Sequence, residues 1–182
     1  MIEKEVKIKV CCSEMERIMN VMRKIGAKVL GNYREVDIYF AHPCRDFSKT
    51  DETLRIRTFN GKDLCELTYK GPRTCSERGV KAREEITARI LRSDVKGLAL
   101  ILRRLGFKEV TRVSKERVEF QIGEVKVALD RVEKLGCFIE IEFPKEELLR
   151  RILDMLNIEE KFVEKTYLEM LLNHNLESIK NN

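Results

Sequence analysis

The chain has 182 residues, of which 43% are hydrophobic and 37% are charged, a balance typical of a globular protein with one sizeable core. The net charge of +5 is spread along the sequence rather than gathered into a basic block, which disfavours a nucleic-acid partner. No apolar run approaches the roughly 20 residues of a membrane helix, and the charged start Met1-Ile2-Glu3-Lys4-Glu5 argues against a secretory signal peptide. These features predict a cytoplasmic protein with no membrane partner.

Six cysteines occur in the sequence, and none has the C-x-x-C spacing of a zinc or redox site. Cysteines of cytoplasmic proteins usually remain thiols. We therefore expect small core or surface residues without a disulfide at Cys11, Cys12, Cys44, Cys65, Cys75 and Cys137.

The first ten residues alternate with the period of two that is typical of a β-strand. Glu3, Glu5 and Lys7 share one face. The other face carries Ile2, Val6, Ile8 and Val10. In a single strand such a charged row would be an ordinary solvated face. Later segments repeat the arrangement, however, and facing charged rows indicate a polar interior inside an apolar outer layer.

A helix is predicted next, with Ser13 and Glu16 spaced as a capping box and Gly26 at its end. Residues 28–41 have the pattern of a strand. The polar loop over residues 42–51 is too long for a tight turn and is a candidate lid.

Asn60-Gly61 predicts a hairpin between a strand over residues 53–59 and a strand that ends at Lys70. Gly71-Pro72 is expected to break the second strand and to open a flexible loop to Gly79. The remaining strands are predicted over residues 80–90, 107–122, 124–130 and 137–143.

Three more helices are predicted. Ser93 is expected to cap one that ends at Gly106, and Pro144 to open one that runs to Leu156. The last helix spans about residues 163–172, and the tail over residues 173–182 is expected to fray.

These elements predict a single domain over residues 1–172 of the α+β, mainly β class. We expect an eight-stranded antiparallel closed β-barrel with flanking helices, because closure removes sheet edges and lets the inside differ from the outside. An open sheet with one wet face is the alternative.

The charged rows contain two chemical classes. The inward acids are Glu3, Glu5, Glu66, Glu85, Asp130, Glu140 and Glu142. The inward bases are Lys7, Arg55, Arg57, Lys70, Lys81, Arg83, Lys115 and Arg117. Burying so many charges without a ligand would be costly. Arginine and lysine bind phosphate oxygens, and Mg²⁺ or Mn²⁺ needs only a few carboxylates when phosphates supply other ligands, so a polyphosphate with a divalent metal fits both classes. The lack of inward Cys or His argues against zinc.

Glu3-Lys4-Glu5-Val6-Lys7 matches the E-x-E-x-K motif, and the sequence resembles the CYTH superfamily of triphosphate tunnel metalloenzymes. The other matching positions follow in the family's order: Arg55-Ile56-Arg57, Lys70, Arg83 with Glu85, Lys115 with Arg117, Asp130 and Glu140-Ile141-Glu142. Residues 37–47 and 135–142 look most like the class IV, CyaB-like adenylate cyclase branch.

The resemblance implies a barrel whose tunnel binds a triphosphate and a divalent metal. The implied metal ligands are Glu3, Glu5, Asp130, Glu140 and Glu142. The implied triphosphate ligands are Lys7, Arg55, Arg57, Lys70, Arg83, Lys115 and Arg117, with Lys81 evenly balanced between phosphate contact and solvated charge. Glu5, Lys7, Arg57 and Glu140 are the expected catalytic residues.

Several nearby side chains are expected to have structural roles. Glu66 and Glu119 are interpreted as charge balance for neighbouring cations. Packing is favoured over base stacking for Tyr39, Phe40 and Tyr167, and His42 is interpreted as a loop residue outside the site.

The branch resemblance implies a metal-dependent enzyme that converts ATP to cyclic AMP and pyrophosphate. Hydrolysis of thiamine triphosphate or inorganic triphosphate is the alternative, since the same cage serves both reactions. A non-catalytic nucleotide or polyphosphate sensor is a further alternative. The expected partner is thus a small-molecule triphosphate, and a homodimer is left open.

Overall fold

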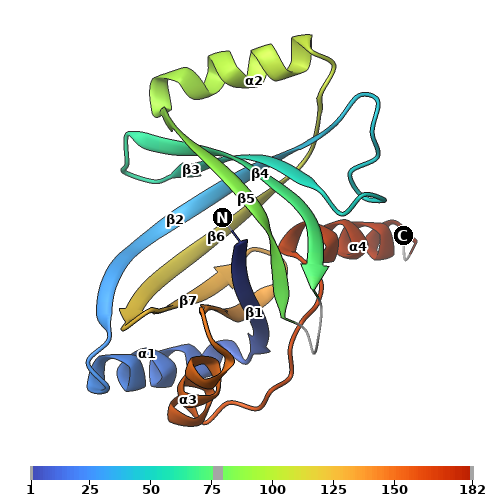
Figure 1. Cartoon of the computed structure of the whole chain (residues 1–182). Coiled ribbons are helices and arrows are strands. Elements are labelled where there is room, and N and C mark those ends of the chain that lie inside the picture. The colour runs from blue at the N-terminus through green and yellow to red at the C-terminus, as the bar shows by residue number, and fades with distance from the viewer. Residues whose placement is uncertain (1, 76–79, 181–182) are drawn as a thin grey trace.

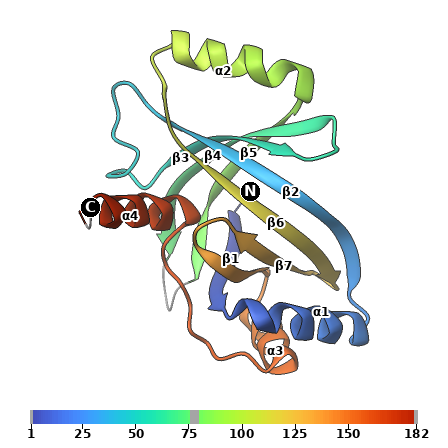
Figure 2. The ribbon, with the colours of Figure 1, turned by 180° about the vertical axis from the view of Figure 1, so that it is seen from behind.

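Eight antiparallel strands close into a barrel in the computed structural model, which describes the backbone of residues 2–75 and 80–180. Side chains are described within these ranges except at residues 2, 3, 74, 75, 81 and 178–180. The strands are β1 (Ile2–Val10), β2 (Lys28–Ala41), β3 (Thr53–Phe59), β4 (Leu64–Cys75), β5 (Lys81–Leu91), β6 (Lys108–Ile122), β7 (Val125–Val132) and β8 (Gly136–Glu142). Their order around the barrel is β1-β5-β4-β3-β2-β6-β7-β8, which confirms the predicted closed barrel (Figures 1 and 2).

Helices cover the outside of the barrel. They are α1 (Met15–Lys24), α2 (Val95–Arg104), α3 (Glu146–Leu156) and α4 (Tyr167–Lys180). In both ribbon views α1 and α3 lie together on one side, while α2 lies on the opposite side (Figures 1 and 2). Within the described residues, no helix is both long and apolar enough to cross a bilayer.

The hydrophobic core lies between the outer face of the barrel and the helices. Val6 and Ile141 are fully buried there against residues such as Ile18 of α1 and Leu153 of α3. A second cluster places Ala99 and Leu102 of α2 on Ile56 of β3. The apolar rows of β1 and β8 therefore face outward into the core, as the period-two pattern predicts.

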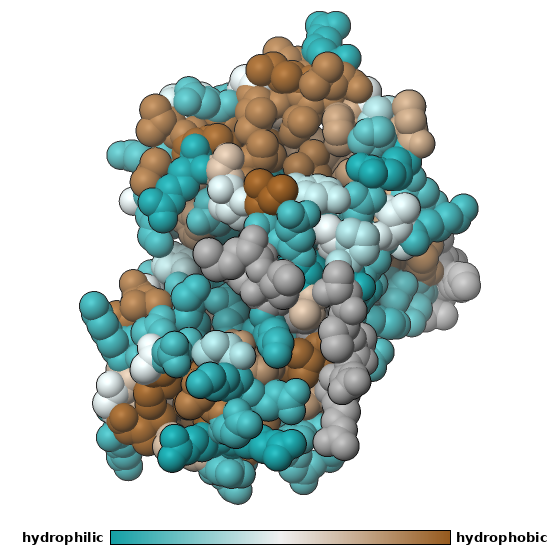
Figure 3. All heavy atoms as spheres, in the orientation of Figure 1, coloured by the Kyte–Doolittle hydropathy of each residue, from teal (hydrophilic) through white to brown (hydrophobic). Residues whose placement is uncertain are grey.

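Helix α2 and Leu105, the residue after it, expose large apolar side chains to solvent. Leu100, Ile101 and Leu105 are 52%, 57% and 63% exposed, although the opposite face is packed on the barrel. Figure 3 shows hydrophobic side chains gathered over this side of the molecule, whereas the middle of the same view is mainly hydrophilic.

The predicted break at Gly71-Pro72 is wrong, because β4 continues through both residues to Cys75. The register with β5 shifts between Lys70 and Arg73 and again between Arg73 and Cys75. Such irregularities let a strand accommodate a proline that has no N–H to donate. Of the predicted second loop, residues 76–79 lie outside the described part of the chain.

Both predicted serine caps are also wrong. Ser13 lies inside a 3₁₀ turn (Cys12–Glu14) that precedes α1, and its hydroxyl lies 3.0 Å from the Cys11 sulfur. Ser93 lies inside the corresponding turn before α2 (Arg92–Asp94). Neither helix has a side-chain cap hydrogen bond. Helix α4 begins and ends later than predicted, so most of the segment expected to fray is helical.

A disulfide joins Cys12 to Cys137, so the prediction that all cysteines remain thiols is wrong for this pair. The antiparallel pairing of β1 with β8 places Val10 opposite Cys137, which brings Cys12 near a residue 125 positions away in sequence. Spacing within the sequence does not reveal such a contact. Cys11, Cys44 and Cys65 are free.

We expect reduction of this disulfide to destabilise the protein, because the crosslink closes a long loop and restricts the unfolded chain. The expected loss of unfolding free energy for Cys12→Ser is about 2 to 4 kcal/mol. Urea denaturation without reductant measures it, with Cys44→Ser at an exposed free thiol as the control. Equal stabilities for wild type and Cys12→Ser would contradict the prediction.

Candidate functional site

A charged cavity of about 420 Å³ lies inside the barrel and is lined by residues from all eight strands. Ten of the predicted site residues line it: Glu5, Lys7, Arg55, Arg57, Lys70, Arg83, Lys115, Arg117, Glu140 and Glu142. Two other predicted site residues, Glu3 and Lys81, have side chains that are not among those the structure describes. Asp130 stands directly behind the cavity wall, fully buried. Alternation along the strands thus predicted most of the charged residues that line the cavity.

Cations and acids oppose one another across neighbouring strands. Directly opposed residues on one face of a sheet have side chains within interaction distance. The opposed pairs are Lys7 with Glu140, Arg57 with Asp37, Lys115 with Glu35, Arg117 with Asp130 and Lys70 with Glu85. The shortest distances between the charged atoms of these pairs are, in the same order, 3.1, 2.6, 3.1, 2.6 and 2.5 Å. The strand register therefore prearranges the charges.

Asp130 holds cations from β6 in place. Its carboxylate accepts hydrogen bonds from Arg117 at 2.6 and 2.7 Å, from Lys115 at 3.2 Å and from the Tyr167 hydroxyl at 2.9 Å. Expected as a metal ligand, this side chain contacts cations of the protein in the structure. β6 and β7 are joined by a short turn between Ile122 and Val125, and the register of this hairpin could have indicated that Arg117 lies opposite Asp130.

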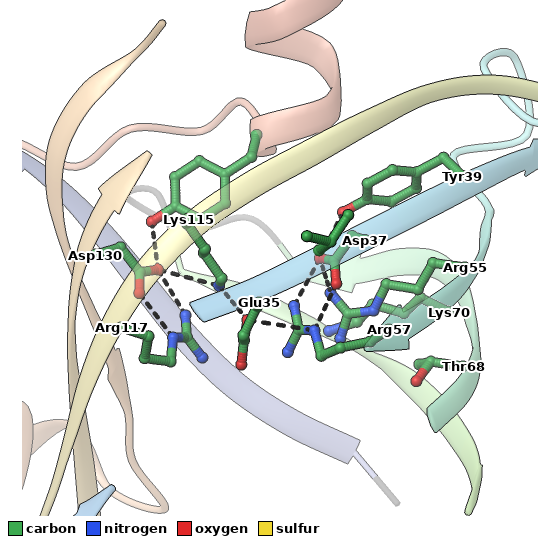
Figure 4. A network of polar contacts seen from close by, with 12 residues as sticks. Glu35, Asp37, Tyr39, Arg55, Arg57, Thr68, Lys70, Lys115, Arg117 and Asp130 are labelled. Carbon is green, nitrogen blue, oxygen red and sulfur yellow. Dashed lines mark hydrogen bonds and ion pairs between the residues drawn. The ribbon is translucent and has the colours of Figure 1, made fainter. Parts of the chain in front are cut away.

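The sequence interpretation missed two buried acids of β2, Glu35 and Asp37. Each is 1% exposed, and Figure 4 shows Glu35 between the group around Asp130 and the group around Asp37. The available signal was the alternation Tyr33, Glu35, Asp37, Tyr39 within the predicted strand, which places all four on one face.

Burial alone would raise the pKa of Glu35, but attraction to Arg57 and Lys115 outweighs it and lowers the pKa from 4.5 to about 2. The same balance lowers the pKa of Asp37, with Arg57 and Arg55 as the cations. A carboxyl whose pKa is lower in the folded state stabilises that state above its unfolded pKa. This stabilisation is lost as the pH falls toward the folded pKa.

Acid should therefore destabilise the protein through these carboxylates. We expect the unfolding free energy to change little from pH 7 to about pH 5.5 on their account and to fall between about pH 4.5 and 2, with about 3 kcal/mol from Glu35. Urea titrations across this range measure the loss. Asp37→Asn, which lacks one of the carboxyls, should lose less over the same interval, and an equal loss would contradict this assignment.

The carboxylates of β1 and β8 fit a divalent cation that also binds phosphate. Glu5 lies opposite Glu142, and both line the cavity with Glu140. Burial opposes ionisation of Glu140, but Lys7, Lys115 and Arg117 keep its pKa well below the usual value. Among the described side chains, no group of three or more His, Cys, Asp or Glu could hold a metal alone. Hard cations accept phosphate oxygens as their other ligands, so Glu5, Glu140 and Glu142 fit a divalent cation that is shared with a bound phosphate.

The three aromatic residues lie in buried clusters, and Tyr39 and Phe40 also line a cavity. Tyr39 and Tyr167 belong to one buried cluster, and Phe40 packs near Ile56. Tyr167 also lines the charged cavity, with its ring 4.0 Å from Lys7 Nζ, a contact that the sequence interpretation did not anticipate. His42 accepts a hydrogen bond from the backbone N–H of Cys44. It does not line the charged cavity, but it lines a second, mainly apolar cavity.

A second cavity of about 590 Å³ adjoins the first and is mainly apolar. The candidate lid forms much of its wall, together with residues of β2 and α4 such as Phe40 and Leu168. The two cavities share four lining residues: Tyr39, Thr53, Arg83 and Thr166. Two Arg73–Asp51 hydrogen bonds of 2.6 and 2.7 Å tie the end of the lid segment to β4.

The fold and the site define a class of protein, namely closed antiparallel barrels with a tunnel-like interior of paired cations and acids. The chain belongs to the CYTH domain family, whose model matches residues 1–167. The resemblance seen in the sequence is thus confirmed, and the protein is a CYTH triphosphate-tunnel protein.

Three proteins illustrate what the chain is similar to. The "Putative adenylate cyclase MJ0240" of Methanocaldococcus jannaschii is 34% identical over 180 residues, covering 93% of this chain and 98% of the relative. The structure of the PH1819 protein from Pyrococcus horikoshii OT3 is 42% identical with a TM-score of 0.81, covering 94% and 99% of the two chains. The Hippeastrum protein HpAC1 is described as a putative adenylyl cyclase with a dominant triphosphatase activity. It is 17% identical with a TM-score of 0.71 over 91% and 93% of the chains, which shows the shared fold alone.

Proposed function

We propose that the protein is a metal-dependent adenylate cyclase, which converts ATP to cyclic AMP and pyrophosphate in the barrel. The observation that carries the proposal is the junction of a charged cavity with a mainly apolar one. The charged cavity suits a triphosphate, and the apolar cavity suits an organic group attached to it. This junction favours an organic triphosphate over inorganic triphosphate.

The charge balance of the site supports a metal cofactor. Among the described side chains, nine Lys or Arg residues and seven Glu residues line the cavity, and Asp37 and Asp130 contact these cations from behind. These nine positive and nine negative charges cancel, so a bare triphosphate would bring several uncompensated negative charges into the barrel. When bound, Mg²⁺ or Mn²⁺ would neutralise part of this charge and lower the pKa of the ribose 3′-hydroxyl.

The protein's own side chains would orient and stabilise the phosphates. Arg57 and Arg117 are planar donors whose guanidinium groups are already held by carboxylates, and arginine binds phosphate oxygens bidentately. Lys7 adds a buried ammonium from β1. In the cyclase reaction the 3′-hydroxyl oxygen bonds to the α-phosphorus and pyrophosphate departs, so cations around the leaving group stabilise the developing charge.

The second candidate is a triphosphatase that releases phosphate from thiamine triphosphate or another organic triphosphate. The same cavities support it, because the reactions differ only in which phosphorus faces the nucleophile. The Hippeastrum protein, a putative adenylyl cyclase, is described as having a dominant triphosphatase activity. A non-catalytic sensor is less well supported, since carboxylates in the cavity weaken simple anion binding.

Product analysis tests the proposal. The protein is incubated with Mg²⁺ or Mn²⁺ and with ATP, thiamine triphosphate or inorganic triphosphate, and the products are separated by chromatography. Cyclic AMP with equimolar pyrophosphate from ATP supports the cyclase, whereas phosphate release without cyclic AMP supports the triphosphatase. Binding without turnover of any of the three supports the sensor. Chelation of the metal should abolish turnover.

A further inference from the structure

Strand β2 occupies a special place in the charged barrel, because it lies between the two strands that supply most of the buried cations. Its neighbours are β3, which carries Arg55 and Arg57, and β6, which carries Lys115 and Arg117. The inward acids of β2 therefore have cations on both sides (Figure 4).

Asp37 holds the two arginines of β3. Its carboxylate accepts hydrogen bonds of 2.6 and 2.7 Å from Arg57 Nε and Nη2 and one of 3.2 Å from Arg55 Nη1. The two bonds to Arg57 involve different carboxylate oxygens, so they define the plane of the guanidinium group. Both arginines line the charged cavity, whereas Asp37 is 1% exposed and is not one of its lining residues.

Glu35 connects the clusters on either side of β2. One of its oxygens, Oε2, lies 3.1 Å from Lys115 Nζ and 3.3 Å from Arg57 Nε. This oxygen is buried and has no partner that meets hydrogen-bond geometry among the described residues. A bridging charge between two cations explains why a buried carboxylate is stable in this position.

We propose that Glu35 and Asp37 are positioning residues, which hold Arg55, Arg57 and Lys115 in the orientation needed to bind phosphate before the ligand arrives. The inference rests on the proposed function only in that the cavity binds a triphosphate. Preorganised donors bind more tightly because less side-chain freedom is lost on binding. The acids act through the cations and need not contact the ligand.

A simple counter-charge would behave differently from a positioning residue. If Asp37 only balanced charge, Asp37→Glu would retain its effect and Asp37→Asn would make the cavity more positive and tighten polyanion binding. If Asp37 positions the arginines, Asp37→Glu keeps the charge but moves the carboxylate by one methylene group and weakens binding. The conservative variant therefore separates geometry from charge.

The test measures binding of inorganic tripolyphosphate in the presence of Mg²⁺ by calorimetry. We expect Asp37→Glu and Glu35→Asp each to weaken binding at least tenfold while the circular dichroism spectrum remains that of the wild type. In an Arg57→Ala background, Asp37→Glu should change the affinity by less than threefold, because its principal partner is already absent. Glu133→Gln is the control, since it removes an exposed acid that pairs with Arg34 on the surface.

Wild-type affinity in both conservative variants would overturn the inference, and so would a full effect of Asp37→Glu in the Arg57→Ala background. If Asp37→Glu fails to fold, Glu35→Asp is tested alone. Weaker tripolyphosphate binding then supports the inference, and wild-type affinity overturns it. Failure of the wild type to bind tripolyphosphate would overturn the inference together with the triphosphate site. Tight wild-type binding without cyclic AMP formation would instead reject only the cyclase proposal.

Discussion

An Ile141→Asp substitution should unfold or aggregate the protein. Ile141 is fully buried in the core between the barrel and helices α1 and α3, opposite Val6 and Val127 on the neighbouring strands. An aspartate there would be a buried charge with apolar surroundings, at a cost of about 3 to 5 kcal/mol or more. The total stability of a domain is only about 5 to 15 kcal/mol. Thermal melts followed by circular dichroism measure the effect.

The adjacent substitution Glu142→Leu is the matched control. Glu142 points to the other face of β8, where its side chain is 33% exposed and pairs with Lys126 at 3.0 Å. Glu5 lies directly opposite, so removal of one carboxylate relieves repulsion between like charges. We expect the variant to remain folded with a lower affinity for metal. A stable Ile141→Asp beside an unfolded Glu142→Leu would invert the faces of the barrel.

Glu140→Gln and Glu5→Gln should each lose most activity while the barrel remains folded. In the structure Glu140 forms ion pairs with Lys7 and Arg117 in the charged cavity. Glutamine keeps the volume but removes a charge that orders these cations and is suited to bind metal. We expect turnover to fall on the order of 100-fold or more, the scale of losing one well-placed electrostatic group.

Steady-state rates across a range of Mg²⁺ concentrations separate the two roles. If the carboxylates bind metal, the variants should need more Mg²⁺ for half-maximal turnover. A lower rate with an unchanged Mg²⁺ requirement would assign Glu140 to ordering Lys7 and Arg117 only. Normal metal-dependent turnover in both variants would show that the metal assignment is wrong, and Glu133→Gln again controls for loss of a carboxylate.

Local alternation predicted much of the fold and most of the charged residues that line the cavity. Residues two apart on a strand share a face, so Lys115 and Arg117 could be placed inside the barrel before any contact was known. The same rule applied to β2 would have included Glu35 and Asp37. The errors at Ser13 and Ser93 have a different cause, since a short 3₁₀ turn moves the start of a helix past the residue that resembles its cap.

Period-two alternation states which face of a strand a side chain occupies, but not which side chain lies beside it. Barrel closure pairs β1 with β8, and this one contact sets Lys7 against Glu140 and brings Cys12 to Cys137. The placement of β2 between β3 and β6 likewise gives Glu35 its two cations. Faces follow from local backbone geometry and are therefore readable along the chain. Partners depend on strand order and register, which are set by packing among residues far apart in sequence.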